Sequence, residues 1–101
     1  MPRVIFSISY AIKEDMRDDY LETIQALKNY LVHEHGKDYS VYEIHGKKNQ
    51  FSEVYVCKTM EEYDQLEDDA DDVTDQLINR IVDDFIDGGK ISYSTLIESV
   101  E

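Results

Sequence analysis

The side chains most able to do chemistry in this sequence lie in two short runs, YSVYEIH and FSEVYVCK, which the polar stretch GKKNQ separates. Glu43 and His45 stand two residues apart in the first run, and Glu53 lies in the second. Two carboxylates and an imidazole in one enclosure can bind a divalent cation or move a proton. Because every strand places residues i and i+2 on one side, plain hydrogen bonding satisfies the same spacing. We therefore assign no catalytic residue, no metal ion and no cofactor.

Three more polar side chains belong to the same candidate surface. Tyr55 follows Glu53 on the same side of its strand, and Ser7 and Ser9 alternate in the opening run RVIFSISYAI. We predict that a small-molecule ligand would contact this set, which consists of Ser7, Ser9, Glu43, His45, Glu53 and Tyr55.

Other common chemistries lack their sequence patterns. Cys57 has only Lys58 as a basic neighbour, and Lys58 points to the opposite side of the strand, so an inert thiol is expected. DGGK follows a helix and precedes a strand, the reverse of the order in a phosphate-binding loop. In DDADDVTDQLIN, Val73 and Asn79 occupy the positions where a calcium-binding EF-hand loop needs Gly and Glu.

The charge and the single cysteine limit the partners and the compartment. The net charge is −13, with 23 acids against 10 Lys and Arg, so phosphate backbones and anionic membrane surfaces would repel the chain. No apolar run approaches the roughly 20 residues that span a bilayer. One Cys cannot form an internal disulfide, which favours a reducing cytoplasm. We predict a cytoplasmic protein that binds neither nucleic acid nor membrane.

The acidic stretch TMEEYDQLEDDADDVTDQ has a structural explanation. Thr59 and Glu62 match a capping box, and Asp71 or Asp72 can cap a second helix. The other acids would lie on the solvated side of these two helices. Docking of a basic protein partner and loose cation binding remain alternatives.

Periodicity predicts the elements that position the candidate residues. RVIFSISYAI and KISYSTLIESV alternate as strands, and YSVYEIH and FSEVYVCK form a hairpin. A long first helix carries Met16, Tyr20, Ile24, Leu27 and Leu31 and ends near Gly36. A short helix carries Met60, Tyr63 and Leu66, and another carries Val73, Leu77, Ile78, Ile81, Val82 and Phe85 and ends at DGG.

The order is strand, helix, strand, strand, helix in two pieces, strand. It predicts one α+β, ferredoxin-like split βαβ domain over residues 1–101, with a four-stranded antiparallel sheet and helices on one face. Right-handed crossovers would put the first and third strands in the centre. The face predicted to meet the helices consists of Val4, Phe6, Ile8, Tyr10, Tyr42, Ile44, Val54, Val56, Ile91 and Tyr93.

The uncovered face of this sheet mixes apolar and polar side chains. Ile5, Val41, Tyr55 and Leu96 would form an exposed apolar patch there, among Ser, Glu and His residues. Two copies that pack these faces together would bury the patch. We predict a homodimer through the open sheet face, with a solvated sheet as the alternative.

The whole chain resembles the dimeric α/β-barrel superfamily, and within it the antibiotic-biosynthesis-monooxygenase-like group. The similar segments are VIFSISYAI, MRDDYLETIQALKNYLVHEHG, YSVYEIH and EVYVCKTMEEYDQLED. The resemblance implies ferredoxin-like subunits whose sheets face each other in a dimeric α/β barrel. The superfamily includes cofactor-free oxygenases, haem-degrading enzymes and proteins of unassigned role, so the fold alone selects no activity.

Three functions follow as hypotheses. The first is a small cytoplasmic homodimeric binding or accessory protein with no identifiable catalytic motif. The second is a cofactor-free oxygenase-like enzyme that holds a small aromatic or polyketide-like substrate between helices and sheet. The third is an acidic protein-interaction module. The haem-degrading branch uses a Trp and a His near the short second helix; this chain has no Trp, so no catalytic residue is carried over.

Overall fold

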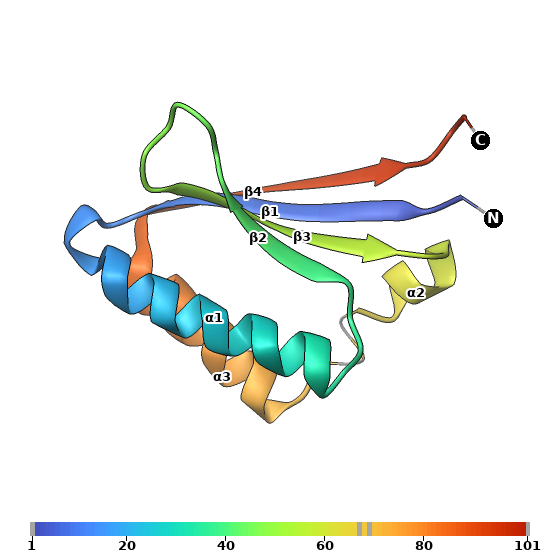
Figure 1. The fold of residues 1–101 in the computed structure, drawn as a ribbon, viewed down its shortest axis with the longest axis horizontal. Helices are drawn as coiled ribbons and strands as arrows, with labels where there is room; N and C mark the ends of the chain where they lie inside the picture. Colours follow the sequence, from blue (N-terminus) through green and yellow to red (C-terminus); the bar gives the residue numbers. More distant parts are fainter. Residues whose placement is uncertain (1, 67, 69, 101) are drawn as a thin grey trace.

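The computed structural model, which describes residues 2–66, 68 and 70–100, is a four-stranded antiparallel sheet with helices on one face (Figure 1). The elements are β1 (Val4–Ile12), η1 (Glu14–Met16), α1 (Arg17–His33), β2 (Tyr39–Glu43), β3 (Gln50–Cys57), α2 (Met60–Asp64), α3 (Asp72–Arg80), η2 (Ile81–Phe85) and β4 (Ile86–Ile97). The strand order β2-β3-β1-β4 places β3 and β1 in the centre, which confirms the predicted ferredoxin-like arrangement. Within the described ranges, no helix has the length and apolar character to cross a membrane.

The helix α1 forms where the apolar residues recur at steps of three and four. Its buried residues are Tyr20, Thr23, Ile24, Leu27 and Leu31, which lie on one stripe against the sheet. The helix ends as predicted: Gly36 takes a left-handed φ of 63°, which costs a glycine little, and the N–H of Lys37 bonds to the carbonyl of Leu31 at 3.0 Å. The chain then turns back into β2.

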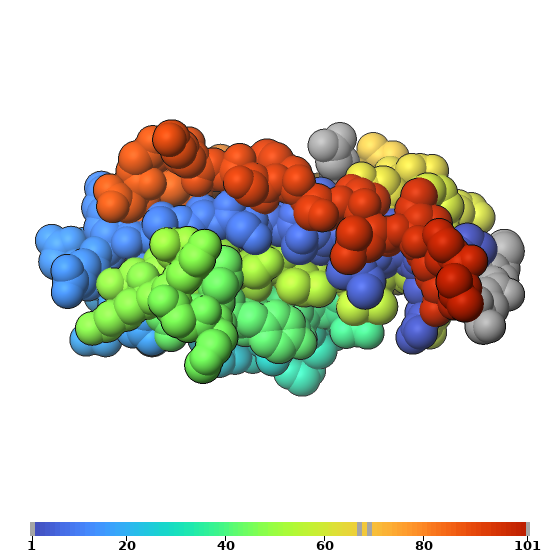
Figure 2. All heavy atoms as spheres, turned by 90° about the horizontal axis from the view of Figure 1, so that it is seen from above, coloured from blue at the N-terminus to red at the C-terminus, as the bar shows by residue number. Residues whose placement is uncertain are grey.

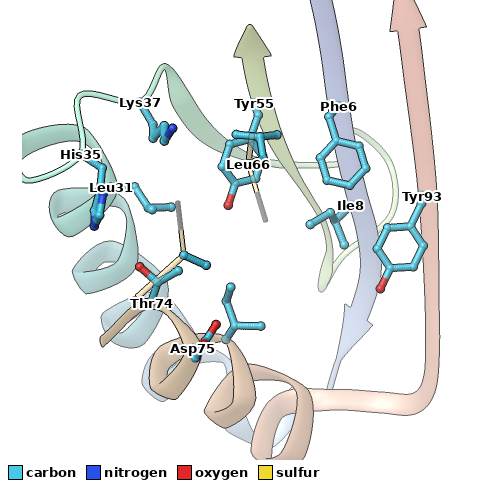
Figure 3. Close-up of a pocket in the computed structure, with 12 residues that line it drawn as sticks. Phe6, Ile8, Leu31, His35, Lys37, Tyr55, Leu66, Thr74, Asp75 and Tyr93 are labelled. Atoms are coloured by element: carbon cyan, nitrogen blue, oxygen red, sulfur yellow. The ribbon is translucent and has the colours of Figure 1, made fainter. Parts of the chain in front are cut away.

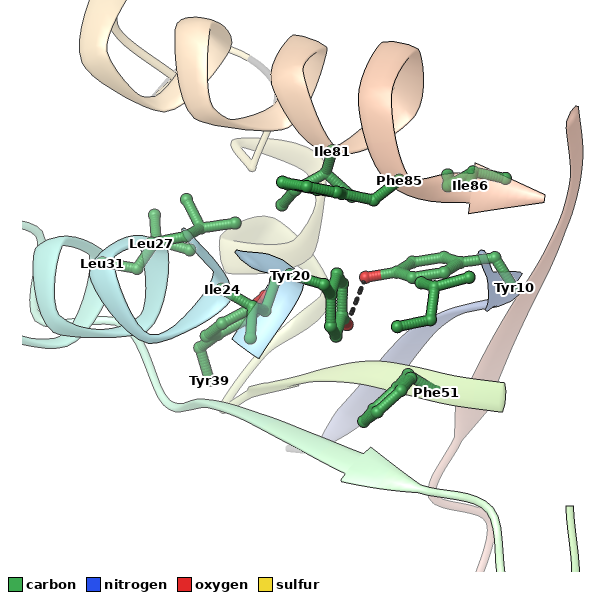
Figure 4. Close-up of a cluster of buried hydrophobic side chains, with 11 residues drawn as sticks. Tyr10, Tyr20, Ile24, Leu27, Leu31, Tyr39, Phe51, Ile81, Phe85 and Ile86 are labelled. Atoms are coloured by element: carbon green, nitrogen blue, oxygen red, sulfur yellow. Dashed lines mark hydrogen bonds between the residues drawn. The ribbon is translucent and has the colours of Figure 1, made fainter. Parts of the chain in front are cut away.

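Aromatic rings fill the centre of the core between α1, η2 and the sheet (Figure 4). The ring of Tyr20 lies 6.0 Å from that of Tyr10, 4.7 Å from that of Phe51 and 6.1 Å from that of Phe85, centroid to centroid. Tilted and edge-on pairs of this kind add to the stabilisation from burial. The hydroxyl groups of Tyr10 and Tyr20 satisfy each other through a 2.8 Å hydrogen bond, so neither is left unpaired in the core.

The side of β2 and β3 that faces the helices is the opposite of the predicted one. The prediction put Tyr42, Ile44, Val54 and Val56 inside, and Val41, Glu43, His45, Glu53, Tyr55 and Cys57 outside. In the structure, Glu53 and Cys57 are buried, and Val41 and Tyr55 pack against the core. The register pairs Glu53 with Ile8 of β1, which lies on the helix side. Both sides of this hairpin carry apolar residues, so alternation sets the period but not which side faces inward.

The passage from α3 to β4 also differs from the prediction. The helix does not end at DGG: β4 already begins at Ile86, and Gly88 and Gly89 lie inside it with φ of 72° and 68°. The pairing with β1 shifts register in this region: Tyr10 pairs with Ile91, but Ile12 pairs with Ile86, so β4 bulges away from β1 between them. Val73 and Val82 are 44% and 42% exposed rather than buried, and Val82 lies in the π-helical turn η2, which changes the helical period.

Candidate functional site

A cavity of about 410 Å³ lies between the helices and the sheet, beside the end of α1 and the start of α3 (Figure 3). Its sheet side consists of Phe6, Ile8, Tyr55 and Tyr93, and its helix side includes Leu31, Thr74 and Ile78. His35, Lys37 and Asp75 supply polar lining. This volume is in the range of small-molecule sites, and a mostly apolar lining with a few polar groups is typical of them.

Aromatic rings form the sheet wall of this cavity. The rings of Phe6 and Tyr93 are nearly parallel, with 6.2 Å between centroids and 12° between planes. Tyr55 lies 6.1 Å from Phe6 and 4.8 Å from Tyr39 on its other side. Tyr93 is 66% exposed although it faces the cavity from the edge strand β4. Flat apolar surfaces of this kind suit a planar ring.

A recess of about 70 Å³ adjoins the cavity and shares Ile8, Tyr55, Ile78 and Tyr93 with it. Glu53 lines this recess and is only 5% exposed. Its Oε1 accepts a hydrogen bond of 2.6 Å from the hydroxyl of Tyr39. Burial raises the pKa of Glu53, and hydrogen bonds from Tyr39 and Tyr10 oppose that rise. A carboxylate in this setting can accept a proton or a hydrogen bond from a bound molecule.

The tyrosines around Glu53 remain protonated at neutral pH. Burial is the main cause that raises the pKa of Tyr10, Tyr39 and Tyr55, and the negative charge of Glu53 raises each of them further. Burial also raises the pKa of Tyr20, which bonds to Tyr10. The hydroxyl groups of Tyr39 and Tyr10 act as hydrogen-bond donors to the carboxylate, and Glu53 is the basic group of the recess.

Asp71 joins the end of α1 to the start of α3 beside the cavity. Its Oδ2 accepts a hydrogen bond from the hydroxyl of Tyr30 and lies 3.0 Å from Nε2 of His35. Its Oδ1 caps α3, because it accepts a hydrogen bond of 2.9 Å from the N–H of Thr74. The Tyr30 hydroxyl is the largest cause that holds the pKa of Asp71 well below its usual range, and the same bond raises the pKa of Tyr30 to about 12. This junction positions His35 and Thr74 at the cavity wall.

Of the six predicted ligand-contacting residues, only Glu53 and Tyr55 line the cavity or its recess, while Glu43 and His45 line a separate hollow beside the loop after β2. Ser7 and Ser9 belong to the opposite sheet face, where the Ser9 hydroxyl donates to Oγ of Ser52 at 3.0 Å. His45 lies in the loop after β2, outside both the cavity and the recess. The expected enclosure of Glu43, His45 and Glu53 is therefore not formed.

Glu43 instead forms an ion pair with Arg17. Arg17, at the start of α1, donates from Nη1 and Nη2 to its two carboxylate oxygens at 2.6 and 3.0 Å, and the N–H of Asn49 adds a bond of 2.9 Å. Arg17 is the main cause that lowers the pKa of Glu43 to about 2. Among the described residues there is no group of three His, Cys, Asp or Glu side chains that could hold a metal ion.

The sequence pattern does not indicate the roles of several residues in or beside the cavity. Tyr39 and Tyr10 were expected as strand residues, and His35 as a residue at the end of α1, without a link to Glu53 or Asp71. The available signal was the pair Phe51 and Glu53: had the bulky Phe51 been placed inside, alternation would have carried Glu53 inside with it.

Comparison by sequence matches this chain to no protein-family model and to no curated protein. Comparison by structure finds the same fold in a conserved protein from Methanosarcina mazei Go1, with a TM-score of 0.80 and 14% identity over 98% of this chain and 95% of that one. A candidate antibiotic biosynthesis monooxygenase from Caulobacter crescentus CB15 gives a TM-score of 0.76 at 10% identity, covering 98% and 91% of the two chains. An uncharacterised NIPSNAP domain protein from Burkholderia xenovorans gives 0.73 at 12%, covering 95% and 94%. The chain thus has the ferredoxin-like fold of these proteins.

Proposed function

We propose that this protein binds a small, largely apolar aromatic molecule in the cavity between its helices and its sheet. The observation that carries the proposal is the cavity of about 410 Å³ with Phe6, Tyr55 and Tyr93 on one wall and aliphatic side chains on the other. Protein interiors are otherwise packed to the density of organic crystals, so a space of this size and lining suits an occupant. Proteins of the same fold that carry the name antibiotic biosynthesis monooxygenase also support a small-molecule role.

A cavity-filling substitution tests the proposal. Ile78 lines both the cavity and its recess, so Ile78→Trp would occupy the space that a ligand ring needs. With 2-naphthol as the probe in isothermal titration calorimetry, we expect saturable binding of one molecule per native chain and a loss of at least about tenfold in affinity for the variant.

The matched control is Val73→Trp, a substitution on the same helix at an exposed position outside the cavity. It should leave 2-naphthol binding unchanged, and both variants should keep the circular dichroism spectrum of the native protein. Absence of saturable binding to the native protein, or equal binding by the two variants, would contradict the proposal.

We further propose that the working form is a homodimer through the open face of the sheet. Because β2 and β3 turn inward the residues expected outside, the apolar part of this face consists of Ile5, Tyr42, Val54, Val56 and Leu96 rather than the predicted set with Val41 and Tyr55. Leu96 and Tyr42 are 60% and 58% exposed. Serines 7, 9, 52, 92 and 94 lie among them and would supply hydrogen bonds across the interface.

An oxygenase-like enzyme is the second candidate function, and one observation favours it. Glu53 is a buried carboxylate at the cavity, able to take a proton from a bound phenol or enol and so make the ring easier to oxidise by molecular oxygen. The proton would pass to a carboxylate oxygen, and the negative charge to the ring. Oxygen consumption in the presence of an anthrone, present in the native protein and lost in Glu53→Gln, would separate this activity from binding alone.

A further inference from the structure

Glu53 occupies a position that an apolar side chain would fill at less free-energy cost. In the described part of the chain it is the only charged residue among the buried ones. It stands on β3 between Phe51 and Tyr55, opposite Ile8 of β1 and Val41 of β2, so its surroundings are those of a core residue. Taking a carboxylate out of water costs several kcal/mol unless partners replace the water. The two partners that act on it are neutral hydroxyl groups, those of Tyr39 and Tyr10.

The side chain of Glu53 lines a small recess beside the cavity. Other walls of this recess, which has a volume of about 70 Å³, include Ile78, Ile86 and Ile91, and the recess adjoins the larger cavity, with which it shares Tyr55. A space of about 10–15 Å³ is enough to hold one water molecule, so the recess has room for a hydroxyl or amino group at the end of a ring. Among the described residues that line the recess, Glu53 alone offers such a group a carboxylate, while the tyrosines among them carry neutral hydroxyl groups and the others are aliphatic.

We propose that the recess selects ligands whose aromatic ring carries a hydrogen-bond donor, namely a phenol, an enol or an N–H group, and that this donor bonds to the Glu53 carboxylate. The inference rests on the proposed function and specifies its ligand class. At a pH above its raised native pKa, Glu53 is ionised and only accepts hydrogen bonds, so a donor on the ligand restores a bond that burial removed, whereas an ether or a carbonyl oxygen at the same place is repelled. Tyr39 is a positioning residue, because its hydroxyl holds Oε1 at 2.6 Å from the β2 side.

The groups that titrate around Glu53 do not compete for this role. They are Tyr39 from β2, Tyr10 from β1, Tyr55 from β3, Tyr20 from α1 and Tyr93 from β4, while the recess residues of α3 and η2 are aliphatic. Hydrogen bonds from neutral tyrosines leave a carboxylate with spare acceptor sites, since it can accept about four. A ligand donor therefore joins the existing bonds and does not need to displace them.

Three probes of one ring system test the inference: 2-naphthol donates a hydrogen bond, 2-methoxynaphthalene only accepts, and naphthalene does neither. In calorimetric titrations of the native protein we expect 2-naphthol to bind at least about tenfold more tightly than 2-methoxynaphthalene, as for a hydrogen bond to a charged group. In Glu53→Gln this advantage should shrink to a few-fold, and in Glu53→Leu it should vanish. The exposed matched control Glu61→Gln should keep the full advantage.

The outcomes separate this inference from the proposed function. If all three probes bind the native protein equally and the Glu53 variants change nothing, the ligand class is wrong while cavity binding stands. If none of the probes binds the native protein, both proposals fall. Because Glu53→Gln keeps the shape of the side chain and removes its charge, it tests the inference even if Glu53→Leu does not fold. A preference that persists in Glu53→Gln and in Glu53→Leu would also overturn it.

Discussion

At the scale of single residues, two glutamates of one hairpin show how position decides chemistry. Glu43 is exposed and meets the guanidinium of Arg17 and the N–H of Asn49, which lower its pKa to about 2. Glu53 is buried, its neighbours are tyrosine hydroxyl groups, and its pKa is raised. Glu43 is therefore ionised at neutral pH and holds Arg17 and Asn49 in place. Glu53 is the group that can take up a proton or accept a hydrogen bond from a ligand.

The raised pKa of Glu53 predicts a pH dependence of stability. The native state keeps the proton of Glu53 to a higher pH than the unfolded chain, whose carboxyl has a pKa near 4.5, so the native state binds more protons in this window. The free energy of unfolding therefore falls as pH rises from 4.5 through the native pKa. Glu53→Gln removes this loss, and we expect it to stabilise the protein at pH 8 by roughly 1–3 kcal/mol and much less at pH 4.

Urea denaturation of the native protein and of Glu53→Gln at the two pH values measures this difference. Glu61→Gln, an exposed acid exchanged in the same way, should show no such dependence. Two results would contradict this prediction: a Glu53→Gln variant that is less stable than the native protein at pH 8, or a stability difference that is equal at both pH values. Either would show that burial of the ionised carboxylate does not destabilise the native state.

The sequence predicts Glu53 and Tyr55 as ligand contacts but does not show which space they face. Period-two alternation is visible in the run FSEVYVCK, yet the residues on one side, Phe51, Glu53, Tyr55 and Cys57, are no more apolar than Val54 and Val56 on the other. The decision depends on Tyr39, Phe51 and Tyr20 packing together in the core, a contact between residues distant in the chain. A rule that glutamates face water pointed the wrong way here.

At the scale of elements, the junction of α1 and α3 frames the cavity. Asp71 caps α3 through the N–H of Thr74 and binds Tyr30 and His35 from the end of α1. Thr74 and His35 both line the cavity, so this one carboxylate sets the positions of two wall residues, one in α3 and one in the turn that follows α1. The carboxylate also meets the positive end of the α3 dipole.

Replacement of Asp71 should therefore affect both folding and binding. We expect Asp71→Ala to lower Tm by several degrees and to weaken 2-naphthol binding, since the helix start and the side chains of Tyr30 and His35 lose their common partner. Thermal denaturation followed by circular dichroism measures the first effect, and calorimetry the second. Asp72→Ala removes the neighbouring exposed acid and should change little. Equal melting temperatures for the two variants would contradict this role.

Short sequence patterns correctly predicted the helix start at Thr59, the long helix and the hairpin. The capping box at Thr59 is confirmed: its hydroxyl accepts from the N–H of Glu62 at 3.1 Å, while Glu62 reaches back to the N–H of Lys58 rather than that of Thr59. The long helix and the hairpin are confirmed as well. The bulge at Gly88 and Gly89 was missed because two glycines after a helix also signal its end, and only pairing with β1 shows that they belong to a strand.

At the scale of the whole molecule, helices on a single face leave the other face of the sheet without a cover from the described helices (Figure 1). Seen from that side, β4, β1, β3 and β2 lie next to one another at the surface (Figure 2). Near the termini, Ile5, Val56 and Leu96 line a hollow on this side. Exposed apolar patches often mark contact sites, and we propose that a second copy of the chain covers this one.

The proposed homodimer predicts the mass of the protein in solution. Light scattering after size exclusion should give twice the chain mass of 11.8 kDa for the native protein. The double variant Ile5→Lys with Leu96→Lys should give the mass of one chain, because two unpaired ammonium groups cannot be buried at the interface. Leu21→Lys, at an exposed apolar position on α1, is the matched control and should remain dimeric. A native protein with the mass of one chain would remove the proposal.

The central claim is that the space between helices and sheet is a ligand site with Glu53 at its inner end, and a crystal structure of the protein with 2-naphthol tests it most directly. We predict the ring beside Phe6, Tyr55 and Tyr93, with its hydroxyl oxygen within hydrogen-bond distance of the Glu53 carboxylate. Naphthol bound only on the open sheet face, or a ring in the cavity with its hydroxyl turned away from Glu53, would contradict the account.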